Sequence, residues 1–184
     1  MTLLPNSLNI DSMYIHDPNS PKSIEFCFLF LTSAAFRKKS IDKQAESMRR
    51  LRRSLSDQIR SILESDNASK TKRAIMEFPE GERLPEKLLR EDHELGNDFA
   101  FIIEELVKTH SVVFAVQDFF VGHPSLADEK RNVIVIRRRG KGGYYPVYAK
   151  NEGNDNSVPE HLHVLPANDL RVELIRTFHV RKER

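Results

Sequence analysis

The chain is organised around an apolar run that contains its one cysteine, Ile24-Glu25-Phe26-Cys27-Phe28-Leu29-Phe30-Leu31. The run is far too short to span a membrane. A cysteine in such a run has two interpretations. It is a buried structural residue, since free cysteine is among the most buried residue types, or it is the nucleophile of a thiol enzyme, held at the start of a helix. The function expected of the chain depends on which of these two roles Cys27 has.

Length and composition indicate one compact domain. A chain of 184 residues with 39% hydrophobic content has enough apolar residues for one core and gives no reason to expect two. We predict an N-terminal arm over residues 1–23, a globular domain over residues 24–180 and a basic tail over residues 181–184. The 29 Lys and Arg residues nearly cancel the 27 Asp and Glu residues, so any basic binding surface must be local.

The single cysteine also limits the chemistry and the setting. One cysteine forms no intramolecular disulfide and cannot build the usual zinc frameworks. Because no secretory signal opens the chain, we predict a reducing, cytoplasmic setting, with the nucleus as the alternative, and no membrane partner. His161 and His163 stand two residues apart without a placed third ligand, which is a weak metal signal, so neither a metal nor a cofactor is expected.

The strongest helical pattern covers residues 40–63. Its apolar side chains recur every three or four residues and so share one face of a helix: Ile41, Ala45, Met48, Leu51, Leu55, Ile59 and Ile62. The basic surface predicted from the opposite face and from a later arginine run consists of Arg49, Arg50, Arg52, Arg53, Arg137, Arg138 and Arg139. This surface is either simply solvated, because acidic residues are interspersed, or an electrostatic surface for phosphate or an acidic partner.

Three runs of β-branched and aromatic residues predict strands at residues 112–116, 132–136 and 144–149. Gly140-Lys141-Gly142-Gly143 predicts a tight turn between the last two of them. Residues 161–165 alternate like a further strand. The fold class predicted from this pattern is α+β, with a small central sheet of three to five strands flanked by helices and the helix over residues 40–63 packed across the sheet.

The order of these elements resembles the ovarian-tumour (OTU) family of cysteine proteases, most of which remove ubiquitin. The strings that carry the resemblance are Cys27-Phe28-Leu29-Phe30, Met48-Arg49-Arg50-Leu51-Arg52-Arg53-Ser54-Leu55-Ser56-Asp57-Gln58-Ile59, Leu95-Gly96-Asn97-Asp98-Phe99, Ser111-Val112-Val113-Phe114-Ala115-Val116 and Tyr144-Tyr145. The resemblance covers roughly residues 24–150. It implies an OTU-like fold in which the Cys27 thiolate attacks an isopeptide carbonyl, backbone amides near Cys27 bind the oxyanion, and a histidine that opens the last strand activates the thiol.

The chain departs from the family pattern at both catalytic loops. Tyr144 stands where the histidine is expected, and tyrosine, with a free pKa near 10, is a poor base at neutral pH. Ser23-Ile24-Glu25-Phe26 replaces the acidic, glycine-bearing loop that usually precedes the cysteine. We therefore expect an OTU-like domain that has lost efficient peptidase activity. Such a domain would bind or scaffold a protein, either ubiquitin or another viral or host partner, as one piece of a larger, viral polypeptide.

Two further functions stay open. In an active OTU-type deubiquitinase, Cys27 would be the nucleophile, His161 or His163 the base, and Asn97, Asp98 or a side chain of the loop over residues 151–157 the orienting group. In a nucleic-acid-associated module, the arginine sets would converge on one surface for the phosphate backbone. The distance between the Cys27 sulfur and the nearest imidazole separates the first of these functions from the others.

Overall fold

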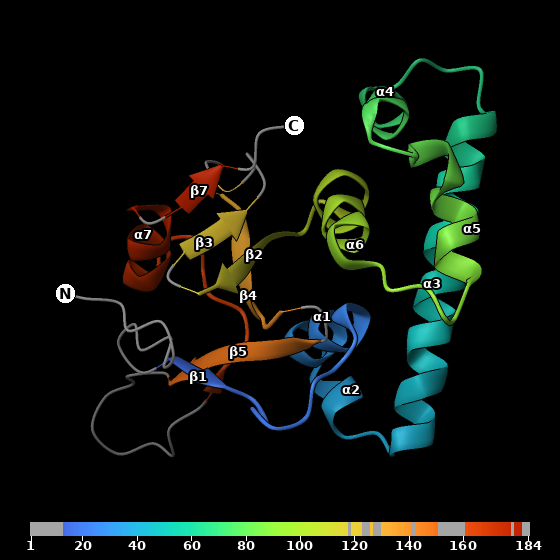
Figure 1. Cartoon of the computed structure of the whole chain (residues 1–184). Coiled ribbons are helices and arrows are strands. Elements are labelled where there is room, and N and C mark those ends of the chain that lie inside the picture. The colour runs from blue at the N-terminus through green and yellow to red at the C-terminus, as the bar shows by residue number, and fades with distance from the viewer. Residues whose placement is uncertain are drawn as a thin grey trace.

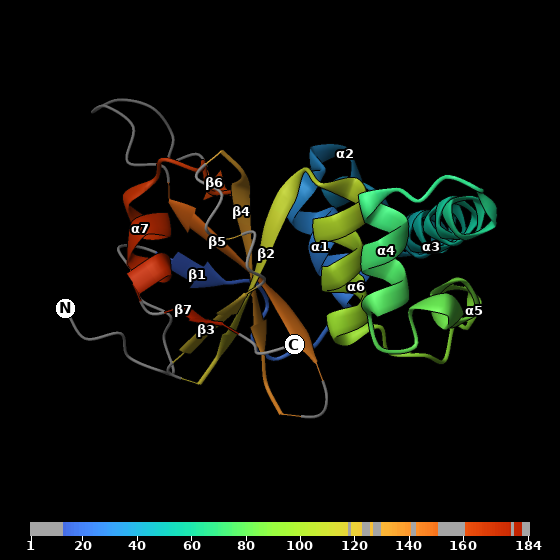
Figure 2. The ribbon, with the colours of Figure 1, turned by 90° about the horizontal axis from the view of Figure 1, so that it is seen from above.

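A mixed β-sheet runs through the molecule, with helices on both of its faces (Figures 1 and 2). The computed structural model describes residues 13–117, 119–122, 126, 130–140, 143–150, 161–177 and 179–181. The strands are β1 (Met13–Ile15), β2 (His110–Val116), β3 (Phe119–Gly122), β4 (Asn132–Arg138), β5 (Tyr144–Lys150), β6 (His161–Leu162) and β7 (His179–Arg181). The helices are α1 (Ile24–Thr32), α2 (Ala34–Arg37), α3 (Ile41–Glu64), α4 (Lys70–Glu77), α5 (Leu84–Leu89), α6 (Gly96–Ile102) and α7 (Leu170–Thr177), with a 3₁₀ turn η1 (Gly81–Arg83) and a π-helical turn η2 (Ile103–Val107).

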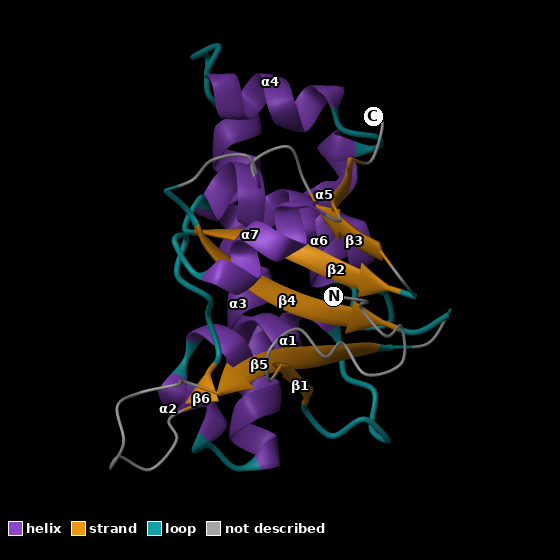
Figure 3. Ribbon diagram, turned by 90° about the vertical axis from the view of Figure 1, so that its left-hand side faces the viewer, coloured by secondary structure: helices purple, strands orange, loops and turns teal. Residues whose placement is uncertain are grey.

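The strand order is β1-β5-β4-β2-β3-β7, and β6 pairs with β5 (Figure 3). The pairs β2–β4 and β3–β7 are parallel, and the other pairs are antiparallel. The three predicted strands are β2, β4 and β5 and lie at the centre of the sheet. Together with β3 they form the centre of the sheet, and the short strands β1, β6 and β7 bring it to seven strands, against the three to five that the sequence predicts. The fold is therefore mixed, with both helices and a sheet, as predicted.

The hydrophobic core has two parts, one on each face of the sheet, because successive side chains of the central strands point to opposite faces. Val112 and Phe114 of β2 belong to the cluster on the α1 and α6 side, whereas Val113 and Ala115 belong to the cluster on the α7 side. Successive side chains of a strand point to opposite faces of the sheet, so a strand that is apolar at every position needs cover on both faces. Helix α7 supplies this cover on one side, and α1 and α6 supply it on the other (Figure 2).

The apolar run around Cys27 folds as helix α1, which packs against β5. The hydroxyl of Ser23 caps the helix by accepting a hydrogen bond from the backbone N–H of Phe26 at 3.3 Å. The run is apolar on nearly all sides, and a helix of that kind is stable only when it is buried. This explains why α1, rather than the longer α3, lies directly on the sheet.

Helix α3 matches the predicted helix within a residue at either end, but its predicted position across the sheet is wrong. It packs on α1, α4 and α5 in the outermost layer of the molecule (Figures 1 and 2). Its buried side chains form a narrow stripe that consists of Arg52, Leu55, Ser56 and Ile59. A stripe with two polar members suits contact with other helices better than contact with an apolar sheet. Within the described residues, no helix has the length and apolar character that crossing a membrane requires.

Several sequence predictions concern residues outside those described. These are the first part of the N-terminal arm (residues 1–12), Lys141 and Gly142 of the tight turn, the loop over residues 151–157 and the last residues of the tail (182–184). The described part of the arm contains β1, which pairs with β5 as an edge strand of the sheet.

Candidate functional site around Cys27

Cys27 lies inside helix α1, in its first turn, because the apolar run itself forms the helix. Its backbone N–H donates the first bond of the helix, to the carbonyl oxygen of Ser23 at 3.2 Å. This amide is therefore occupied and cannot bind an oxyanion without breaking the helix. The Cys27 side chain is 0% exposed and is part of the core cluster beneath the sheet. The interpretation of Cys27 as a buried structural residue agrees with this position.

The surroundings of the thiol oppose its ionisation. Burial raises the pKa of Cys27 well above its ordinary value, and the nearby carboxylate of Glu25 raises it further. A thiol protease needs the opposite shift, because the thiolate is the nucleophile. Among the described side chains, no histidine forms a hydrogen bond with Cys27.

Tyr144 opens β5 and is buried beside the cysteine, with 2% of its surface exposed. Burial is the main reason that its pKa rises to about 12, and the carboxylate of Glu94 and the Cys27 thiol add to the shift. A phenol with that pKa stays neutral at physiological pH, so Tyr144 cannot remove a proton from Cys27. The sequence pattern points to this tyrosine, but no motif indicates Glu94.

Gly96 permits the close approach of the Tyr144 ring to helix α6. A Cβ atom at residue 96 would lie 3.0 Å from the Tyr144 hydroxyl oxygen, and the backbone φ of Gly96 is +45°. Both facts favour glycine at this position. In the segment Leu95-Gly96-Asn97-Asp98-Phe99, the glycine therefore leaves room for the Tyr144 side chain.

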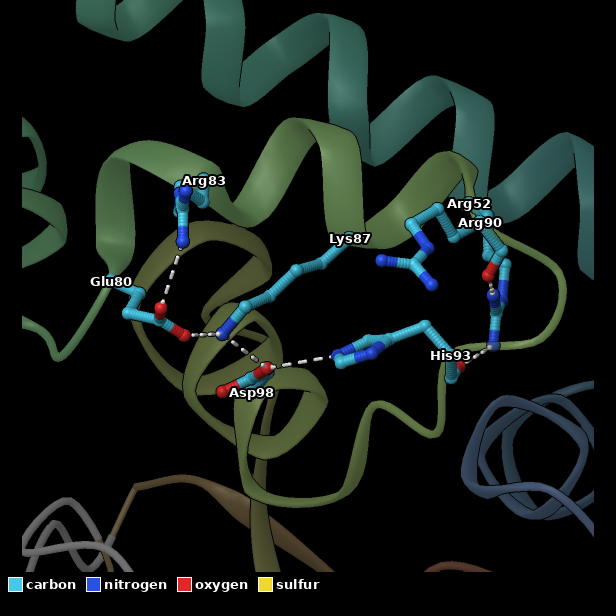
Figure 4. A network of polar contacts seen from close by, with 7 residues as sticks. All are labelled: Arg52, Glu80, Arg83, Lys87, Arg90, His93 and Asp98. Atoms are coloured by element: carbon cyan, nitrogen blue, oxygen red, sulfur yellow. Dashed lines mark hydrogen bonds and ion pairs between the residues drawn. The ribbon is translucent and has the colours of Figure 1, made fainter.

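The other candidate catalytic residues lie elsewhere. His163 packs its ring against Phe30 and Tyr148, with centroids 5.6 Å and 5.5 Å apart. The side chain of His161 is outside the described part of the chain. Asn97 is exposed, and the carboxylate of Asp98 lies 3.3 Å from Lys87 Nζ and 3.7 Å from His93 Nε2 (Figure 4). The structure therefore brings Tyr144 to Cys27 but brings neither His163 nor Asp98 there.

Arg52 was predicted to lie on the basic surface, and this prediction is wrong. The side chain is 8% exposed, and its guanidinium binds the buried carboxylate of Glu25 at 2.6 Å. It also donates to the carbonyl oxygens of Arg90 at 2.6 Å and His93 at 3.0 Å, so one side chain fixes the loop that carries Glu94 (Figure 4). The missed signal was helical spacing, because Arg52 stands three, four and seven residues before the buried Leu55, Ser56 and Ile59.

The remaining arginines do not form one continuous surface. Arg49, Arg50 and Arg53 are exposed on α3, and Arg138 and Arg139 are exposed at the end of β4. Helices α1 and α6 lie between α3 and the sheet (Figure 2). Arg137 was also predicted on the surface and is buried, because both faces of β4 are covered along residues 133–137. Arg139 lies over the ring of Tyr145 at 5.5 Å.

Comparison of the chain with models of protein families, with curated proteins and with solved structures found no match. The resemblance to the OTU family therefore rests on the strings and the element order given above.

Proposed function

We propose that this chain is an OTU-like domain without peptidase activity at Cys27 and that it acts as a protein-binding module. The observation that carries the proposal is the position of Cys27, fully buried in α1 with its amide bonded to Ser23. The expected partner is ubiquitin, a ubiquitin-like protein or another viral or host protein.

The chemistry of a thiol peptidase makes three demands on this site. The sulfur must be accessible, the thiol must ionise near neutral pH, and amide donors must be free for the oxyanion. Cys27 has no exposed surface, the pKa of its thiol is raised, and its amide is engaged. Each of these properties opposes turnover, and the neutral phenol of Tyr144 gives the thiol no base.

The outer face of α3 supports the binding part of the proposal. Arg49, Arg53 and Arg60 are exposed there and have no ion pair within the described residues. The opposite side of α3 already packs on α1, α4 and α5. The outer face is therefore open to a partner that presents carboxylates, and the bidentate guanidinium groups suit such a partner.

A ubiquitin-derived electrophilic probe tests the catalytic part. We expect no covalent adduct with the native chain, and the same result for Cys27→Ala. A small thiol reagent applied to the unfolded chain should label Cys27 fully, which establishes that the thiol is intact. An adduct on native Cys27 would overturn the proposal and favour the active deubiquitinase.

Titration with ubiquitin and with duplex RNA at two salt concentrations tests the binding part. We expect binding of the protein partner that weakens in the variant Arg49→Ala/Arg53→Ala but not in the control Arg73→Ala, which removes an exposed arginine of α4. Binding of RNA with a steep loss of affinity at high salt would instead support the nucleic-acid-associated module. Binding of neither ligand would contradict ubiquitin as the partner and the nucleic-acid-associated module.

A further inference from the structure

The segment of residues 13–22, which we call the N-terminal strap, lies along the edge of β5. Its strand β1 pairs Met13 with Ala149 and Ile15 with Val147. Its other end is fastened by two backbone hydrogen bonds, from Lys22 N–H to the Tyr144 carbonyl at 2.9 Å and from Tyr144 N–H to the Lys22 carbonyl at 3.1 Å. The strap therefore covers the edge of β5 up to the residue that lies beside Cys27.

The end of the strap near Pro21 packs closely against Gly143, the residue before β5. Pro21 fills the space in front of Gly143, where an added Cβ would meet the Pro21 Cβ at 2.2 Å. Lys22 is followed directly by Ser23, the cap of α1, so movement of the strap reaches the first turn of the cysteine helix.

Between its two ends, the strap is held by an aromatic cluster that consists of His16, Phe30, Tyr148 and His163. The His16 ring lies 4.2 Å from the Phe30 centroid and 6.2 Å from that of Tyr148. His163, which directly follows β6, contacts the rings of Phe30 and Tyr148 as well. Two half-buried imidazoles thus share one pair of aromatic rings. His16 also donates its backbone N–H to the Pro146 carbonyl at 2.9 Å.

Within the described residues, charged groups of both signs lie around this cluster. On the helix side, the Arg37 guanidinium lies 5.8 Å from the Phe30 ring centroid, and on the strap Lys22 Nζ lies 5.5 Å from that of Phe26. On the strap, the carboxylate of Asp17 lies 3.8 Å from the Lys22 ammonium. Among the described residues, Tyr148 contacts the His16 ring directly, and His163 contacts the same Phe30 and Tyr148 rings. Burial is the main reason that the pKa of His16 is lowered; the Asp17 carboxylate opposes this shift, and the Lys22 ammonium adds to it.

We propose that the N-terminal strap is an acid-sensitive latch, with His16 as its sensor, and that protonation loosens the strap from β5 and uncovers the edge beside Tyr144 and Cys27. A proton on His16 would place a positive charge in this partly desolvated aromatic cluster, where the Phe30 and Tyr148 rings replace water around the imidazole. We expect the strap, and not the central strands, to detach, because it contributes only a three-residue strand at the edge of the sheet.

Hydrogen exchange of the strap amides at pH 7.5 and pH 5.5, corrected for the intrinsic effect of pH, tests the latch. We expect protection of the amides of His16, Lys22 and Tyr144 to fall severalfold at the lower pH, while the amides of β2 and β4 stay protected. The variant His16→Phe, which keeps a ring against Phe30, should lose this response. His110→Phe is the matched control, because His110 is another half-buried histidine that lies away from the strap and should leave the response intact.

Modification of Cys27 by 4,4′-dithiodipyridine, which reacts with thiols in acid, is the second measurement. Its rate should rise at pH 5.5 in the native chain and stay low in His16→Phe. Should His16→Phe fail to fold, His16→Gln removes the same titrating imidazole with a smaller side chain and should also lose the response. Strap protection that does not change with pH, or that changes equally in His16→Phe and the native chain, would overturn the proposal.

Discussion

Arg52 of α3 and Glu25 of α1 form a buried ion pair in which the guanidinium Nε donates to the carboxylate at 2.7 Å. The pair joins the outer helix layer to the cysteine helix. Removal of one partner leaves a buried charge without compensation, which costs far more than the net contribution of the intact pair. We expect Arg52→Met to lower the free energy of unfolding by about 3–5 kcal/mol. Chemical denaturation measures this loss.

The neighbouring residue provides the control for Arg52. Arg53 is exposed on the same helix, so Arg53→Met should change the stability by no more than about 0.5 kcal/mol. Addition of Glu25→Gln to Arg52→Met removes the stranded charge and should recover part of the loss. Equal effects of Arg52→Met and Arg53→Met would mean that the pair contributes nothing to stability.

Local periodicity was sufficient to predict helix α3 and the central strands, because the spacing of apolar residues reports which face each element buries. It did not place α3 in the outer layer, because that position depends on competition with α1 for the sheet. The partner of Arg52 lies 27 residues earlier in the chain, and the contact of Tyr144 with Gly96 spans a longer interval. Such pairs follow from the packing of whole elements, and no pattern within one element encodes them.

The contact between Gly96 and Tyr144 predicts a specific cost for an added methyl group. Gly96 and Gly140 both have positive φ, +45° and +50°, but only at Gly96 would the new Cβ meet another atom within 4 Å. Gly140→Ala should therefore cost about 1–2 kcal/mol from backbone strain alone, and Gly96→Ala should cost more. Thermal or chemical unfolding of both variants gives the comparison.

Tyr144→Phe tests whether the Tyr144 hydroxyl causes the extra cost of Gly96→Ala, since it removes the oxygen that faces Gly96. In a double variant with Gly96→Ala, the cost of the methyl group should approach that of Gly140→Ala. If the cost of Gly96→Ala is the same with tyrosine and with phenylalanine at residue 144, the hydroxyl does not restrict this position.

Glu104 predicts a pH dependence of stability. It lies in the π-helical turn η2, 1% exposed, and accepts a hydrogen bond from the backbone N–H of Val112 at 2.6 Å. Burial raises the pKa of Glu104 to about 7, although Val112 and Arg131 oppose the shift. Between the ordinary carboxyl pKa and about 7, the folded chain holds this proton and the unfolded chain releases it. The contribution of Glu104 to stability therefore decreases as the pH rises through this window.

Replacement of Glu104 isolates this contribution. Glu104→Gln keeps an acceptor for Val112 but does not titrate, so its stability relative to the native chain should increase between pH 5 and pH 8. The increase should be about 1.4 kcal/mol for each unit of pKa shift. Glu86→Gln, at an exposed position of α5, is the control, because Glu86 is not among the groups that shift the pKa of Glu104. A constant difference between Glu104→Gln and the native chain across this range would contradict the raised pKa.

The burial of Cys27 predicts how its thiol reacts at pH 8. A thiol with no exposed surface and a raised pKa can be modified only when the protein opens, so a small aromatic disulfide should react with the native chain far more slowly than with the unfolded chain. Arg52→Met destabilises the helix layer that packs on α1 and should speed the reaction, whereas Arg53→Met should not. Reaction of the native chain as fast as the unfolded chain would show that Cys27 is accessible, and it would remove the main support for an inactive peptidase site.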